Sequence, residues 1–146
     1  MKKLFIVLAV ALGLSACGPT TTLYYWGGDQ NKTTKYENLA YLNYDKQTPQ
    51  SICKLVCVYE DMVTKPGGAK NVPPPGICAE YGYLLLLPET SETFENKATA
   101  GQKRTFSRKD YSSFFPEYGI ILLQKEIEFY PESAIFINPL IEKFRN

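Results

Sequence analysis

Apolar residues recur every three to four positions along most of the chain, which is the period of an amphipathic α-helix. The clearest pattern follows Thr48, a residue type that caps helix N-termini, and Pro49, which suits the first helical position. We predict a helix from this point to the turn at Pro66-Gly67-Gly68. Its single apolar stripe comprises Ile52, Leu55, Val56, Tyr59, Met62 and Val63.

Four more segments show the same period, and together they predict an all-α fold. The segments are residues 30–45, Ile77 to Leu87 with Pro88 as its stop, about Phe115 to Tyr130, and Glu132 to Phe144. In the last segment we expect Pro139 to kink the helix and the large apolar residues to face inward. Those inward residues are Ile135, Phe136, Leu140 and Phe144.

Residues 89–110 are rich in Thr, Ser, Glu and Lys and poor in apolar residues. We therefore predict an exposed, mobile insertion without regular structure there. Its second half is basic, but acidic residues of the same stretch offset that charge. We interpret the basic residues as solvated loop charge rather than as a patch for an anionic partner. They are Lys97, Lys103, Arg104, Arg108 and Lys109.

The first 16 residues have the pattern of a secretion signal. Lys2 and Lys3 supply a positive start, residues 4–14 form an apolar run, and small residues precede Cys17. The apolar run is too short to span a bilayer stably as a mature helix. We predict a cleaved signal peptide at residues 1–16, with cleavage between Ala16 and Cys17.

Residues 14–17, with the sequence LSAC, resemble the lipobox of bacterial lipoproteins. The resemblance implies that Cys17 becomes the lipid-modified first residue, with diacylglycerol on its sulfur and an acyl chain on its amine. Two or three chains anchor a protein durably, because each buried methylene contributes about 0.8 kcal/mol. By resemblance to lipoprotein sorting rules, Gly18 and Pro19 lack the aspartate that retains lipoproteins in the inner membrane. The resemblance therefore favours the periplasmic side of an outer membrane in a cell with two membranes. The alternative is an ordinary cleaved signal followed by a chance cysteine.

The mature chain of about 130 residues suits one domain, at residues 23–146 after a tether at residues 17–22. The precursor has 16 Lys and Arg against 15 Asp and Glu, and removal of Lys2 and Lys3 leaves 14 against 15. This balance offers no electrostatic case for binding nucleic acid. The absence of histidine removes the usual general base and the commonest zinc or copper ligand. We predict no catalytic site, no metal site and no cofactor besides the covalent lipid.

Three cysteines remain once Cys17 carries lipid, and export to an oxidising compartment favours a disulfide. Cys53 and Cys57 lie four residues apart on the predicted helix, with Cβ atoms about 5–6 Å apart. A disulfide needs roughly 3.5–4.5 Å. We predict a bond between Cys57 and Cys78, because a turn after residue 65 brings the later cysteine back toward the helix. Three buried free thiols are the alternative.

Three ordered motifs of the mature chain are YYWG at residues 24–27, VPPPG at 72–76 and EIEFYPESAIF at 126–136. They resemble a family of small bacterial lipoproteins, domain of unknown function family 4810. That family is itself similar to tetratricopeptide repeats, as Tyr81-Gly82, Leu85, Leu123 and Pro131 indicate here. The resemblance implies a small tetratricopeptide-like helical hairpin array whose stacked helices share one core.

Members of the family are commonly encoded beside a lipoprotein similar to the curli secretion channel and beside a second small lipoprotein. The resemblance therefore implies a non-enzymatic accessory or scaffold subunit of an envelope lipoprotein assembly, with envelope lipoproteins as its partners. Tyr24, Tyr25 and Trp26 are the candidate interface, since about seven residues, or roughly 25 Å of extended chain, separate them from the anchor. Alternatively, these side chains pack as a staple on the helical core.

Two other functions remain open. A peptidoglycan- or ligand-binding envelope module would stack its aromatic side chains against sugars. A cell-wall hydrolase would require a pair of carboxylates, and it is less favoured because no spacing singles out a pair. The candidate carboxylates are Asp29, Glu37, Asp45, Glu80 and Glu89.

Overall fold

A computed structural model describes residues 21–30, 32–107 and 110–145 of the chain. These residues are mainly helical, with one two-stranded antiparallel hairpin near the start, and this confirms the predicted all-α class. The elements are β1 (Asp29–Gln30), β2 (Thr33–Thr34), α2 (Lys35–Lys46), α3 (Pro49–Thr64), α4 (Ile77–Leu86), α5 (Pro88–Lys97), α6 (Ala100–Lys103), α7 (Tyr111–Phe129), the 3-10 turn η2 (Pro131–Ser133) and α8 (Ala134–Arg145).

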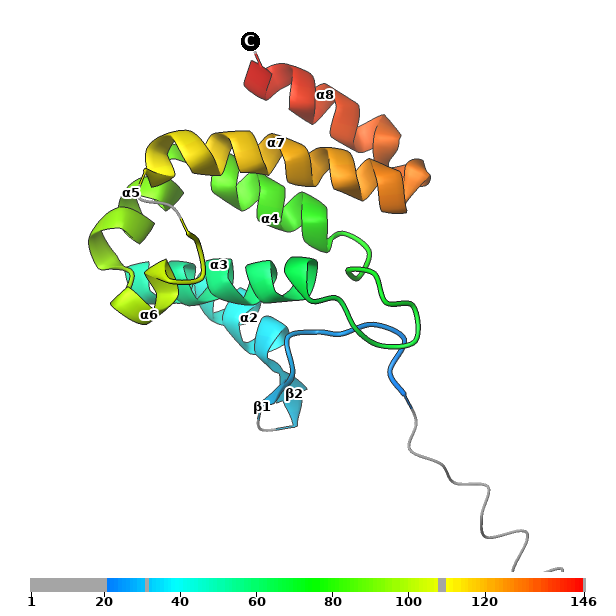
Figure 1. The fold of residues 1–146 in the computed structure, drawn as a ribbon, viewed down its shortest axis with the longest axis horizontal. Helices are drawn as coiled ribbons and strands as arrows, with labels where there is room; N and C mark the ends of the chain where they lie inside the picture. The colour runs from blue at the N-terminus through cyan, green and yellow to red at the C-terminus, as the bar shows by residue number, and fades with distance from the viewer. Residues whose placement is uncertain (1–20, 31, 108–109, 146) are drawn as a thin grey trace, which may run out of the picture.

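Five of the helices form a stack in the order α2, α3, α4, α7 and α8 (Figure 1). Within the stack, α3, α4, α7 and α8 alternate in direction, as the colour gradient in Figure 1 shows. The short helices α5 and α6 cap one end of the stack, where they contact α3 and α7. The stack therefore has two outer helices, α2 near the N-terminal segment and α8 at the opposite side.

Helix α3 forms as its sequence predicts. The hydroxyl of Thr48 accepts a hydrogen bond from the Ser51 backbone N–H at 3.1 Å, and Pro49 occupies the first turn. The predicted apolar stripe faces the core, with Ile52 partly buried and the other five residues buried. Helix α4 also matches its prediction, because it ends at Leu86 just before Pro88.

Helices α4 and α7 pack backbone to backbone. A Cβ atom on Gly82 would lie 2.8 Å from the carbonyl oxygen of Gly119, and a Cβ on Gly119 would lie 2.8 Å from that of Gly82. The buried carboxylate of Glu126 in α7 accepts hydrogen bonds from the backbone N–H groups of Gly76 at 2.7 Å and Ala79 at 3.3 Å. The contact satisfies donors that the first turn of α4 leaves open, so the N-terminus of α4 is held on α7.

The predicted mobile insertion at residues 89–110 is wrong where the structure describes it. Helices α5 and α6 occupy much of this stretch, and the side chains of Phe94 and Phe106 are buried. The Phe94 ring centroid lies 5.0 Å from that of Tyr111 and 5.3 Å from that of Phe115. These two buried phenylalanines hold the segment on the core. The prediction missed this because the segment is polar on average. Arg108 and Lys109 lie outside the described residues.

The inward face predicted for the last helix is also partly wrong. Ile135 is 74% exposed and Phe136 is 78% exposed, while Ile137 and Ile141 are buried. Leu140 and Phe144 pack partly buried against the same core, as predicted. The helix contains two neighbouring apolar stripes, and contact with α7 buries only one of them.

Candidate functional site

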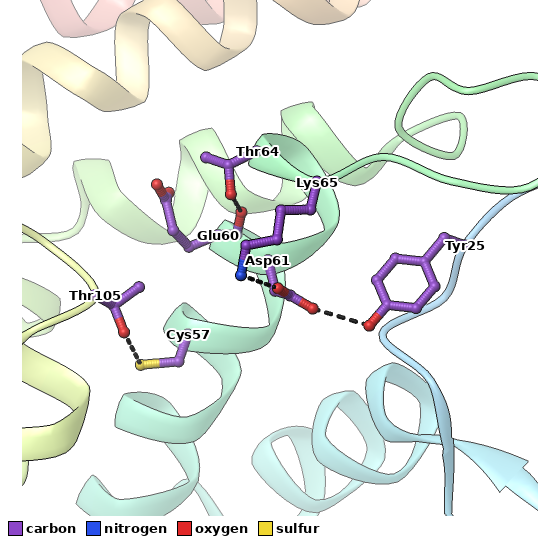
Figure 2. A network of polar contacts seen from close by, with 7 residues as sticks. All are labelled: Tyr25, Cys57, Glu60, Asp61, Thr64, Lys65 and Thr105. Atoms are coloured by element: carbon purple, nitrogen blue, oxygen red, sulfur yellow. Dashed lines mark hydrogen bonds and ion pairs between the residues drawn. The ribbon is translucent and has the colours of Figure 1, made fainter.

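Tyr25 and Trp26 pack against α3 and α2, whereas Tyr24 lies beside Tyr130, just after the end of α7. Figure 2 shows the Tyr25 hydroxyl donating to Asp61 Oδ2 at 2.9 Å, while Lys65 Nζ lies 3.0 Å from Asp61 Oδ1. The ring centroids of Trp26 and Tyr36 are 5.4 Å apart. Burial and the bond to Asp61 raise the pKa of Tyr25. This packing agrees with the staple interpretation of the segment.

The turn after α3 holds the same segment through its backbone. The N–H groups of Ala69 and Lys70 donate to the carbonyl oxygens of Thr22 and Leu23 at 3.0 and 3.1 Å. Gly68 has a φ of +75°, and a Cβ atom there would lie 2.7 Å from the Leu23 oxygen. The glycines that end the helix therefore also let the N-terminal segment approach. All three predicted interface residues are partly buried, and only the remaining exposed part of each is open to a partner.

A cleft of about 560 Å³ runs beside α3, between the N-terminal segment and the loop after α6. Its wall includes Cys57, Asp61 and Lys65, and Figure 2 shows the Thr105 hydroxyl 4.0 Å from Cys57 Sγ. Burial raises the pKa of Cys57 to about 11, so the thiol is protonated at neutral pH. Burial opposes ionisation of Asp61, but the bonds from Lys65 and Tyr25 outweigh it and lower its pKa. The cleft thus combines a protonated thiol with a paired carboxylate, and neither group is a free nucleophile or base.

Much of the tyrosine content lies inside the stack. Four rings form a tyrosine ladder across α2, α3, α4 and α7, with successive centroids 5.8, 5.4 and 6.0 Å apart. Glu80 accepts hydrogen bonds from the first two hydroxyls, at 2.7 and 2.8 Å, and Glu60 accepts one from the third at 3.0 Å. Burial raises the pKa of Glu60. The ladder comprises Tyr36, Tyr59, Tyr81 and Tyr118.

The outer face of α2 carries two further tyrosines, which lie beside Tyr36 of the ladder. Tyr41 is 75% exposed and Tyr44 is 88% exposed, and both border a hollow of about 670 Å³. Tyr36 and Ala40 line the same hollow, and we call these four residues the α2 tyrosine surface. Sequence reasoning missed it, although the three-residue spacing of Tyr41 and Tyr44 places them on one helical face.

The predicted disulfide between Cys57 and Cys78 is wrong. Cys53, Cys57 and Cys78 are free thiols, of which Cys57 is partly exposed and the other two are buried. Cys57 contacts Thr105, whereas Cys78 lies at the N-terminus of α4 close to Glu126. Their side chains therefore meet different neighbours. Burial raises the pKa of Cys78 to about 12, and the free-thiol alternative describes the structure better.

Two of the candidate carboxylates hold the fold together. Glu37 accepts hydrogen bonds from the backbone and hydroxyl of Thr34 at the start of α2, and Glu80 binds the tyrosine ladder. Among the described residues, no group of three or more Cys, Asp or Glu side chains is arranged to hold a metal ion.

The predicted cleavage site at Ala16 and Cys17 lies outside the described residues. Within residues 21–30, 32–107 and 110–145, no helix has the length and apolar character needed to cross a membrane. Comparisons with known protein families, curated proteins and solved structures find no match to this chain.

Proposed function

We propose that the chain is an outer-membrane lipoprotein, anchored through Cys17 on the periplasmic side, which acts as a non-enzymatic accessory or scaffold subunit. Its assembly would consist of envelope lipoproteins related to curli-secretion-like channels, and its helices would be tetratricopeptide-like. The α2 tyrosine surface carries the proposal. Exposed Tyr41 and Tyr44 offer large, rigid, amphipathic contact area, which is typical of protein interfaces.

The polar groups beside this surface favour a protein partner over a glycan. The Asn38 amide donates to the carbonyl oxygens of Gln30 and Thr34, at 3.2 and 3.1 Å. Glu37 accepts from the Thr34 backbone N–H at 2.8 Å. A sugar needs hydrogen-bonding groups beside the aromatic ring, and these neighbours are already engaged in holding β1, β2 and α2 together. Peptidoglycan binding is therefore the second candidate.

The position of α2 also suits a partner on the same membrane. Trp26 of the N-terminal segment packs on Tyr36 of α2. Only residues 18–20 separate Cys17 from Thr21, so full extension places Thr21 within about 14 Å of the anchored residue. The α2 tyrosine surface consequently belongs to the end of the stack that the anchor holds near the lipid.

The experiment is an anchor-preserving purification of the full-length tagged chain from detergent-solubilised membranes. We expect the wild type to recover an envelope lipoprotein in stoichiometric amount. The double variant Tyr41→Ala/Tyr44→Ala should reduce that yield about tenfold or more, as loss of two interface tyrosines does in other complexes. Tyr83→Ala is the matched control, because Tyr83 is an exposed helical tyrosine on α4.

Three results would contradict the proposal. One is a wild type that recovers no envelope partner at stoichiometric yield, and another is an equal loss in the Tyr83→Ala control. The third is retention of the wild type on purified sacculi that depends on Tyr41 and Tyr44, which would favour the glycan-binding function instead. Circular dichroism of each variant verifies that the helices remain folded.

A further inference from the structure

The outer face of α8 is an exposed apolar stripe with one acidic residue before its first turn and one basic residue in its last turn. Ile135 and Phe136 are 74% and 78% exposed, and Pro139 is exposed beside them. Exposed Glu132, in the turn just before the helix, and exposed Lys143, in its last turn, flank this apolar centre. Positions 132, 135, 136, 139 and 143 fall on one side of a helix with 3.6 residues per turn.

The opposite side of α8 is already packed. Ile137 and Ile141 are buried in one cluster with Leu86 of α4 and Leu123 of α7. Figure 1 shows α8 as the last helix of the stack, on the side away from α2 and the N-terminal segment. Stacked helical arrays normally end in a polar outer face. Here the last helix instead exposes two large apolar side chains, those of Ile135 and Phe136.

We propose that a second copy of this chain covers the outer face of α8, through a two-fold symmetric, antiparallel pairing of the two α8 helices. The charge order of the stripe selects this arrangement. An antiparallel pairing centred between residues 137 and 138 brings Glu132 of each copy to Lys143 of the other. The same register packs Phe136 of each copy against Pro139 of the other. A parallel pairing would place like charges side by side.

The size of the stripe sets the strength of the association. Stable dimers bury about 800 Å² on each partner, and a single twelve-residue helix offers less than that. The dimer should therefore be concentration-dependent, with a dissociation constant on the order of micromolar. This inference concerns α8 alone and is independent of the α2 tyrosine surface and its partner.

The experiment measures the mass of the full-length lipoprotein in mild detergent by sedimentation equilibrium over a range of concentrations. We expect a monomer–dimer equilibrium for the wild type and a monomer for Phe136→Asp. Glu132→Lys and Lys143→Glu should each weaken the dimer about tenfold, because each change sets two like-charge pairs across the two-fold axis. The double variant Glu132→Lys/Lys143→Glu should restore the wild-type dissociation constant.

Glu128→Lys is the matched control, since it makes the same charge change at an exposed site on α7, and it should leave the dimer intact. A wild type that stays monomeric at all concentrations overturns the proposal, whether α8 then binds lipid vesicles or another protein. The proposal is also overturned if Glu132→Lys/Lys143→Glu does not restore dimer formation. Phe136 is largely exposed, so the helical circular dichroism of Phe136→Asp should match that of the wild type.

Discussion

Gly82 and Gly119 set the distance between α4 and α7. Because a Cβ atom on either glycine would lie 2.8 Å from the backbone oxygen of the other, Gly82→Ala must push the helices apart. We expect the free energy of unfolding to fall by about 1–3 kcal/mol, as overpacking of a tight contact does. Urea denaturation measures this change.

Gly101→Ala provides the matched control in a second helix. A Cβ atom at Gly101 would meet its neighbours at 3.8 Å, which is ordinary contact, and alanine favours helix more than glycine does. Stability should therefore stay constant or rise slightly. If both variants lost the same free energy of unfolding, the loss in Gly82→Ala would not come from the close contact between α4 and α7.

Glu60 makes a testable contribution to the pH dependence of stability. Its folded-state pKa is raised by burial from an ordinary value of 4.5, so the folded protein holds this proton more tightly than the unfolded chain. Its contribution is present in full below pH 4.5 and is lost as the pH rises through the folded pKa. We expect the free energy of unfolding to differ less between pH 5 and pH 7 in Glu60→Gln than in the wild type.

The exposed carboxyl of Glu142 offers a comparison for this change. Glu142→Gln should keep the wild-type difference between pH 5 and pH 7. Other groups shift the absolute values, because the pKa of Glu126 is also raised, whereas those of Asp61 and Asp110 are lowered. The comparison between variants isolates Glu60. A wild-type pH dependence in Glu60→Gln would show that burial of this carboxyl has no energetic effect.

At the scale of elements, Phe94 is the large apolar side chain that α5 buries. Phe94 is fully buried among Phe106, Tyr111 and Phe115, so Phe94→Ala should cost about 3–5 kcal/mol of stability. Limited proteolysis should then cut the variant within residues 88–107, where the wild type resists. Rapid cleavage of the wild type there would instead support a mobile segment.

Phe136→Ala is the control, because it makes the same substitution at a site that is 78% exposed. Its unfolding free energy should change by less than about 0.5 kcal/mol. The measurement belongs at low protein concentration, where self-association through α8 makes no contribution. Phe94 lies in a polar stretch of the sequence and is buried, whereas Phe136 lies between Ile135 and Ile137 and is exposed, so hydrophobicity along the chain does not by itself locate the core.

Local sequence signals predicted helix ends correctly where a capping residue or a proline restricts the neighbouring backbone. Thr48 and Pro49 begin α3, and Pro88 follows the end of α4. Helix α7 begins four residues earlier than the expected Phe115, because Asp110 caps it by accepting from the Ser113 N–H at 3.2 Å. That cap lay within the stretch predicted as an insertion, and the polar composition obscured it.

At the scale of the whole molecule, the proposed lipid anchor at Cys17 would place the protein at the membrane. We expect Cys17→Ser to move the full-length chain from the membrane fraction to the soluble fraction, because the lipid anchor can no longer form. Mass spectrometry of the mature wild-type N-terminus should find fatty acids on Cys17. Cys57→Ser should remain in the membrane fraction. Membrane retention of Cys17→Ser equal to that of the wild type would contradict the lipoprotein proposal.

The sequence alone determined the helical class and the bounds of α3 and α4, because helix period, caps and proline act through neighbouring residues. The anchor at Cys17 also comes from a local motif and remains a prediction. Tertiary structure decided which tyrosines enter the ladder and which form the α2 tyrosine surface, and it kept the thiols of Cys57 and Cys78 apart. Tertiary structure also determined which side of α8 is buried. These outcomes depend on contacts between residues far apart in the chain, which no local pattern specifies.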